Sequence, residues 1–95
     1  MAAYLMGEIE VTDPATYEEY RKQVLAVVTK YGGRFIVRGG KVETLEGGWA
    51  PKRIALLEFP SMEQAQKWYR SSEYAPLIRI RQKAARGKVL LVAGV

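Results

Sequence analysis

The sequence predicts an α+β protein of the ferredoxin-like type, in which helices cover one face of a four-stranded antiparallel sheet. Four apolar, strand-like segments are interspersed with segments of helical periodicity. Their order is β-α-β-β-α-β, the order of the split β-α-β fold. The chain has 95 residues without a repeat or a linker, which suits one domain over residues 1–95 with a single core.

The first strand and the first helix lie within residues 3–31. Residues 3–11 (AYLMGEIEV) alternate as a strand does. Asp13 is a favoured N-cap, and Pro14 suits the first helical position because its missing N–H would have no partner there. Large side chains then recur at helical spacing, namely Tyr17, Tyr20, Val24, Val27, Val28 and Tyr31. Gly32-Gly33 predicts the end of this helix.

Two strands follow in succession. Residues 34–46 (RFIVRGGKVETLE) predict one long strand or a strand with a break. Gly39-Gly40 within it predicts a bulge or a bend. Residues 47–51 (GGWAP) form a loop, and residues 53–59 (RIALLEF) predict the third strand.

The last third of the chain predicts a helix that is interrupted once, and then a strand. The segment SMEQ from Ser61 has the form of a capping box. The segment SSEY interrupts the helix, with Ser72 as a second cap. The helix then continues to Arg86 and stops at Gly87, and residues 88–95 (KVLLVAGV) form the final strand.

Alternation gives the predicted sheet one apolar face and one mixed face. The apolar face suits the helices and carries Leu5, Ile9, Val11, Phe35, Val37, Ala55, Leu57 and Phe59. The mixed face carries Tyr4, Met6, Glu8, Ile36, Arg38, Ile54, Leu56 and Glu58. It is too apolar to remain bare and too charged for an ordinary core. We therefore expect a homodimer through this open sheet face, in which a second copy encloses Arg38 and Glu58.

The composition excludes several kinds of chemistry. The chain contains no cysteine and no histidine, so disulfides, thiol nucleophiles, histidine-based triads and histidine-ligated metal or haem sites are absent. The acids are scattered, and we expect neither a metal nor a cofactor. No apolar run is long enough for a membrane span. The N-terminal stretch has no signal-peptide pattern, which predicts a cytoplasmic protein without a membrane partner.

Positive charge is concentrated in the second half of the chain. Residues 48–95 contain nine Lys and Arg against three acids, within a net charge of +5. Arg79, Lys83 and Arg86 predict a basic stripe on the last helix. Nucleic-acid binding is not favoured, because the open sheet face lacks the stacking aromatics of RNA-binding relatives of this fold. Arg81 is out of phase with the stripe, which suggests that it points inward.

Several short motifs resemble a bacterial family known as domain of unknown function 1330. They are Arg38-Gly39-Gly40, Glu46-Gly47, Pro51-x-Arg53, Glu58-Phe59-Pro60-Ser61, Ala65, Trp68-Tyr69, Ser71-x-Glu73-Tyr74 and Arg81. The resemblance implies the dimeric α/β-barrel superfamily, which includes cofactor-independent monooxygenases, muconolactone isomerase, chlorite dismutase and stress-responsive proteins. Members of the family often end in Glu-Gly, whereas this chain has Val92-Ala93-Gly94. The resemblance also makes Arg81 a candidate contact of Glu58 or Tyr74.

The candidate site combines charged and aromatic side chains. The expected ligand-binding residues are Tyr4, Glu8, Arg38, Glu58, Tyr69, Tyr74 and Arg81. Among them, Arg38, Glu58 and Tyr74 are the candidate catalytic residues, with Arg38 holding an anion and Glu58 removing a proton. A structural salt bridge between Arg38 and Glu58, and core packing of the aromatic residues, are the alternatives.

Two functions are compatible with these residues. One is a cofactor-independent enzyme or binding protein for a small aromatic or carbonyl-bearing molecule. The other is a non-catalytic dimeric module with a structural or regulatory role.

Overall fold

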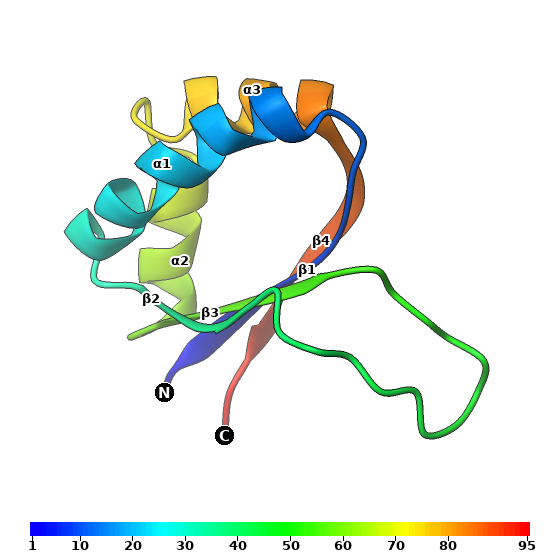
Figure 1. Cartoon of the computed structure of the whole chain (residues 1–95). Helices are drawn as coiled ribbons and strands as arrows, with labels where there is room; N and C mark the ends of the chain where they lie inside the picture. Colours follow the sequence, from blue (N-terminus) through cyan, green and yellow to red (C-terminus); the bar gives the residue numbers. More distant parts are fainter.

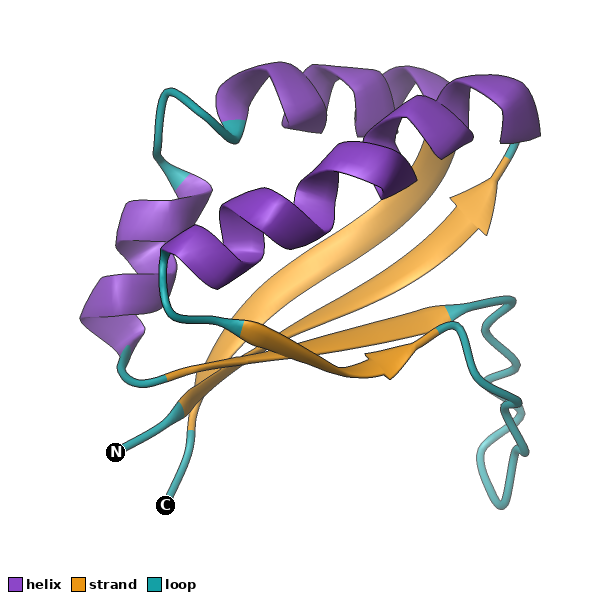
Figure 2. Ribbon diagram, turned by 60° about the vertical axis from the view of Figure 1, so that its left-hand side comes forward, coloured by secondary structure: helices purple, strands orange, loops and turns teal.

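The computed structural model describes residues 1–95 and confirms the predicted ferredoxin-like architecture. The strands are β1 (Ala3–Val11), β2 (Arg34–Arg38), β3 (Ile54–Phe59) and β4 (Ala85–Ala93). The helices are α1 (Pro14–Lys30), α2 (Met62–Tyr69) and α3 (Ala75–Ala84). The sheet order is β2-β3-β1-β4, and all neighbouring strands are antiparallel. All three helices cover the same face of the sheet (Figures 1 and 2), and none is long and apolar enough to cross a membrane.

The helix starts follow from local sequence, as predicted. The Asp13 side chain accepts a hydrogen bond from the Thr16 N–H at 3.2 Å, and Ser61 Oγ accepts one from the Gln64 N–H at 3.1 Å. The break between α2 and α3 is also present. The serine that hydrogen-bonds to the backbone at this break is Ser71, whose Oγ accepts from the Tyr74 N–H at 3.1 Å. The assignment of Ser72 as the cap was therefore wrong.

A bulge in β2 reverses the face on which its last residue lies. Phe35 lies opposite Leu57, but Val37 lies opposite Leu56, so one extra residue is inserted between them. Because side chains alternate with a period of two, this insertion shifts Arg38 to the face that carries the helices. The alternation predicted for residues 34–38 holds only up to the bulge.

Of the two alternatives predicted for residues 34–46, the long strand is wrong, and the strand breaks at Gly39-Gly40, directly after Arg38. Gly39 has a φ of 74°, in the left-handed region that breaks a strand. The residues that follow, up to β3, form a loop that projects from the end of the sheet (Figure 1). Within this loop, Trp49 Nε1 donates to the Glu8 carboxylate at 3.1 Å.

The last strand begins three residues earlier than predicted. α3 ends at Ala84, and the Ala84 carbonyl accepts from the Thr12 N–H at 2.8 Å, at the end of β1. Gly87 lies within β4, where an added Cβ would be 2.4 Å from the Glu8 carbonyl oxygen. This glycine therefore permits close strand contact and does not stop a helix. Arg86 belongs to β4, which removes it from the predicted stripe.

Candidate functional site

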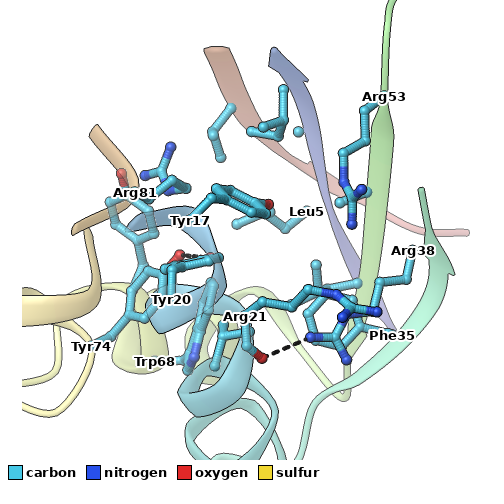
Figure 3. Close-up of a pocket in the computed structure, with 17 residues that line it drawn as sticks. Leu5, Tyr17, Tyr20, Arg21, Phe35, Arg38, Arg53, Trp68, Tyr74 and Arg81 are labelled. Carbon is cyan, nitrogen blue, oxygen red and sulfur yellow. Dashed lines mark hydrogen bonds between the residues drawn. The ribbon is translucent and has the colours of Figure 1, made fainter. Parts of the chain in front are cut away.

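A small cavity lies between the helices and the sheet, inside the single chain (Figure 3). Its volume is about 40 Å³, enough for a few water molecules. Aromatic side chains form much of its wall, namely Tyr17, Tyr20, Phe35, Trp68, Tyr69 and Tyr74. We call it the arginine pocket, because its charged lining residues are Arg21, Arg38, Arg53 and Arg81 and no carboxylate lines it.

The pocket arginines are held by aromatic rings and backbone. The Arg38 guanidinium lies 4.4 Å from the centre of the Phe35 ring and donates to the Arg21 carbonyl at 3.0 Å. Arg53 lies 5.7 Å from the centre of the Tyr17 ring. Arg81 is only 8% exposed. None of Arg38, Arg53 and Arg81 forms an ion pair, since the four salt bridges of the structure involve other cations.

Three buried donors of the pocket lack a hydrogen-bond partner. They are Arg53 Nε, Trp68 Nε1 and Arg81 Nε. Buried donors in folded proteins are nearly always paired, with protein, water or ligand, because an unpaired one costs about 1–3 kcal/mol. All three unpaired donors belong to residues that line this one cavity, which makes it a place for a group rich in acceptor oxygens.

The two deepest phenols can donate hydrogen bonds but cannot act as bases. Tyr20 and Tyr74 share a hydrogen bond of 2.7 Å between their hydroxyls. Burial raises the pKa of both phenols, so they remain protonated at neutral pH. Trp68 stacks on Tyr74 with ring centres 4.1 Å apart. The pocket therefore offers cations and donors to a ligand, and no group that removes a proton.

The structure divides the residues predicted for the site between the two faces of the sheet. Four of them line the arginine pocket: Arg38, Tyr69, Tyr74 and Arg81. The other three, Tyr4, Glu8 and Glu58, lie on the open face. There, Glu58 accepts from Arg34 Nε at 2.6 Å and from the Tyr4 hydroxyl at 3.1 Å.

The predicted pairing of Arg38 with Glu58 is wrong, because the bulge in β2 places Arg38 on the helix side. The pKa of Glu58 is lowered by its hydrogen bonds from Arg34 and Tyr4, whereas a general base would need a raised pKa. Tyr74 and Glu58 were the two contacts suggested for Arg81. In the structure Arg81 lies beside Tyr74 and not beside Glu58.

The sequence analysis missed Arg53, Tyr17 and Tyr20 as lining residues of a site. For Arg53 a signal was present, because it precedes β3 and is in phase with Ala55 and Leu57, which face the helices. The only signal for the two tyrosines was their helical spacing. This spacing is the same for residues that line a pocket and for residues of a packed core.

The sequence matches the profile of the family described as "Domain of unknown function (DUF1330)" over residues 2–95. The chain belongs to this family. A search of the curated proteins found no significant match.

Solved structures share the fold of this DUF1330 protein at low sequence identity. A protein of unknown function from Rhodopseudomonas palustris has a TM-score of 0.78 at 16% identity, covering 99% of this chain and 82% of that one. SnoaB, a cofactor-independent oxygenase from Streptomyces nogalater, has a TM-score of 0.67 at 11% identity, with coverages of 99% and 93%. A proposed antibiotic biosynthesis monooxygenase from Nitrosomonas europaea has a TM-score of 0.62 at 14% identity, with coverages of 100% and 99%. At these identities the likeness establishes the fold alone.

Proposed function

We propose that this protein is a cofactor-independent enzyme that binds a small aromatic or carbonyl-bearing acid in the arginine pocket and stabilises its anionic form. The observation that carries the proposal is the set of three unpartnered donors, on Arg53, Trp68 and Arg81, in a cavity with no carboxylate. Arginine holds carboxylate and phenolate oxygens through charge-assisted hydrogen bonds. The aromatic walls suit a flat ligand.

The substrate contributes most of the chemistry in this proposal. Because no base lines the pocket, the ligand is an acidic phenol or enol that releases its proton to solvent. The nearby guanidinium of Arg81 lowers the pKa of the bound ligand and holds the resulting oxyanion. The Tyr74 hydroxyl lies beside Arg81 and so remains a candidate contact of the substrate.

An anion stabilised in this way reacts at carbon. Protonation there isomerises the substrate. Alternatively, the carbanion carbon forms a bond to O₂, both electrons of the new C–O bond come from the substrate, and the peroxide anion takes up a proton. The fold shared with a cofactor-independent oxygenase makes the second route worth assaying. The first route takes up a proton from solvent, and the second consumes dissolved O₂; neither needs a cofactor.

Entry of a ligand requires movement of side chains at the mouth of the pocket. The cavity of about 40 Å³ is smaller than a benzene ring with its substituents. Arg38 and Arg53 are partly exposed, unlike Arg81, so their side chains can rotate outward without breaking an ion pair. We expect this rotation to accompany binding.

A chromophoric phenol such as 4-nitrophenol tests the proposal directly. Its pKa, read from absorbance, should fall by about 1 or more on binding, since a neighbouring cation favours the charged form. Arg81→Met should abolish this fall, whereas Arg79→Met, on the exposed surface of the same helix, should leave it unchanged. Oxygen uptake with quinols then assays turnover. An unshifted phenol pKa with both variants folded would refute the proposal and favour a non-catalytic module.

The open sheet face supports a second part of the proposal, a homodimer. Four apolar residues of β2 and β4 are more than a third exposed, namely Ile36, Val37, Leu90 and Val92. They surround the less exposed Met6 and Leu56 of the central strands. Exposed patches of this kind mark interaction surfaces, and a second copy of the same face is the occupant we propose. The arginine pocket lies on the opposite side of the sheet, so each protomer keeps its own site.

A further inference from the structure

A continuous series of contacts links two separate positive groups in the arginine pocket. Arg53 lies over the Tyr17 ring, and the Tyr17 and Tyr20 rings are 5.5 Å apart between centres. Tyr20 is hydrogen-bonded to Tyr74, which has Arg81 beside it. Figure 3 shows the result, with Arg81 at one end of the pocket, Arg53 at the other and the Tyr17 ring between them.

The two ends differ in exposure. At the inner end, Arg81 is 8% exposed and Trp68 is 1% exposed, and each has a buried N–H without a partner. At the outer end, Arg38 and Arg53 are partly exposed, and both line the pocket. The inner end therefore has two buried donor side chains, and the outer end has two arginines that reach solvent.

A ligand with one negative charge would leave one end unbalanced. No carboxylate lines the cavity, and none of the three arginines forms an ion pair. Like charges in a partly enclosed site repel one another with little screening by water. An acidic group at each end would remove this repulsion. It would also give Arg53 Nε and Arg81 Nε a hydrogen-bond acceptor each.

We infer that the ligand carries two acidic groups, separated by a flat apolar spacer. This inference rests on the function proposed above and specifies its substrate class. The oxygen that becomes negative in the reaction lies at the inner end, with Arg81 and Trp68. A carboxylate lies at the outer end, where the Arg38 and Arg53 guanidiniums bind it through parallel hydrogen bonds. The aromatic walls contact the spacer.

Calorimetric titration with a matched pair of ligands tests the inference. Terephthalate and its monomethyl ester have the same ring and nearly the same length, but they differ by one negative charge. We expect the diacid to bind about tenfold tighter or more, because a hydrogen bond to a charged group contributes about 1.5–3 kcal/mol. The advantage should shrink as salt is added, since the outer end reaches solvent.

Variants at the outer end locate the second charge. Arg53→Met should remove the advantage of the diacid over the ester. Lys52→Met, at the exposed neighbouring residue that does not line the pocket, should change neither affinity. Equal binding of the two ligands to the unmodified protein overturns the inference while leaving the proposed function intact. Absence of binding by both ligands overturns the inference and the proposed function together.

Discussion

Substitution of Gly39 by alanine should disturb the arginine pocket without replacing any of its lining residues. The Cβ that alanine adds at this position would lie 2.7 Å from Cζ of Arg53 and 2.9 Å from its Nη1. Atoms this close cannot both remain in place. Because the guanidinium is the free end of a flexible side chain, Arg53 will move, and it will move away from the position that places Nε in the pocket.

The same substitution also has a backbone cost that can be estimated. Gly39 has a φ of 74°, and an alanine in the left-handed region costs about 1–2 kcal/mol. For a domain of this size, each kcal/mol lowers Tm by about 4–8 °C. Loss of one hydrogen bond between Arg53 and an anion should weaken binding by about tenfold. Gly39→Ala should therefore reduce both Tm and the affinity for the diacid.

Gly40 provides the matched control. It has no positive φ, and no atom lies within 4 Å of the Cβ that alanine would add. Gly40→Ala should keep both Tm and affinity, as measured by differential scanning calorimetry and isothermal titration. If the Gly39→Ala variant is less stable but binds the diacid as tightly as the Gly40→Ala variant does, the conclusion that Arg53 binds the ligand is incorrect.

Three other predictions concern the sheet. Gly87→Ala should lower the unfolding free energy by about 1–3 kcal/mol in chemical denaturation, because the added methyl group would overlap the backbone of β1. Leu90→Lys should convert the proposed dimer to a monomer in light scattering, because it would place a charge on a side chain that is 55% exposed within the apolar patch of the proposed interface. Glu58→Gln should lower Tm at neutral pH and leave ligand binding unchanged. Hydrogen bonds from Arg34 and Tyr4 lower the pKa of Glu58 in the folded protein. The stability that ionised Glu58 gives the fold is therefore fully present above the pKa of this residue in the unfolded chain, and it is lost as the pH falls through the pKa in the folded protein.

Each of these predictions has its own control. Gly7→Ala is the comparison for Gly87→Ala, since the nearest atom to its added methyl group would be 3.6 Å away. Leu25→Lys changes a leucine of similar exposure, 48%, on α1 and should leave the dimer intact. For Glu58→Gln, a loss of ligand binding would mean that Glu58 contributes to the ligand site. That result would contradict the conclusion that Glu58 lies on the open face, away from the pocket. A Tm difference that persists at acid pH would contradict the pKa argument.

The fold was predictable because most of its signals are local. Asp13 and Ser61 begin helices with their own side chains, and the alternation in β1 fixes which of its residues face the helices. The end of α3 was not predictable in this way. Ala84 and Ala85 are compatible with a continued helix, and the Ala84 carbonyl is instead bonded to Thr12 at the end of β1, far away in the sequence.

The site was predictable only in part, for a related reason. Tyr74 and Arg81 were correctly grouped, because the position of Arg81 out of phase with the exposed residues of α3 is visible in the sequence. Arg38 was placed on the wrong face, because a bulge depends on how two strands pair and leaves no fixed mark in either of them. One inserted residue was enough to separate Arg38 from Glu58.

The uneven distribution of charge along the chain has an explanation in the fold. Residues 48–95 contain nine basic residues and three acids, and two of these acids, Glu58 and Glu73, pair with cations of the first half. This leaves the same segment with no acid near Arg53 or Arg81, which lie in the pocket. A nucleic acid has its phosphates on a stiff, bulky backbone and cannot bring one to a guanidinium that is 8% exposed. The buried part of the positive charge is therefore suited to a small anion that enters the protein.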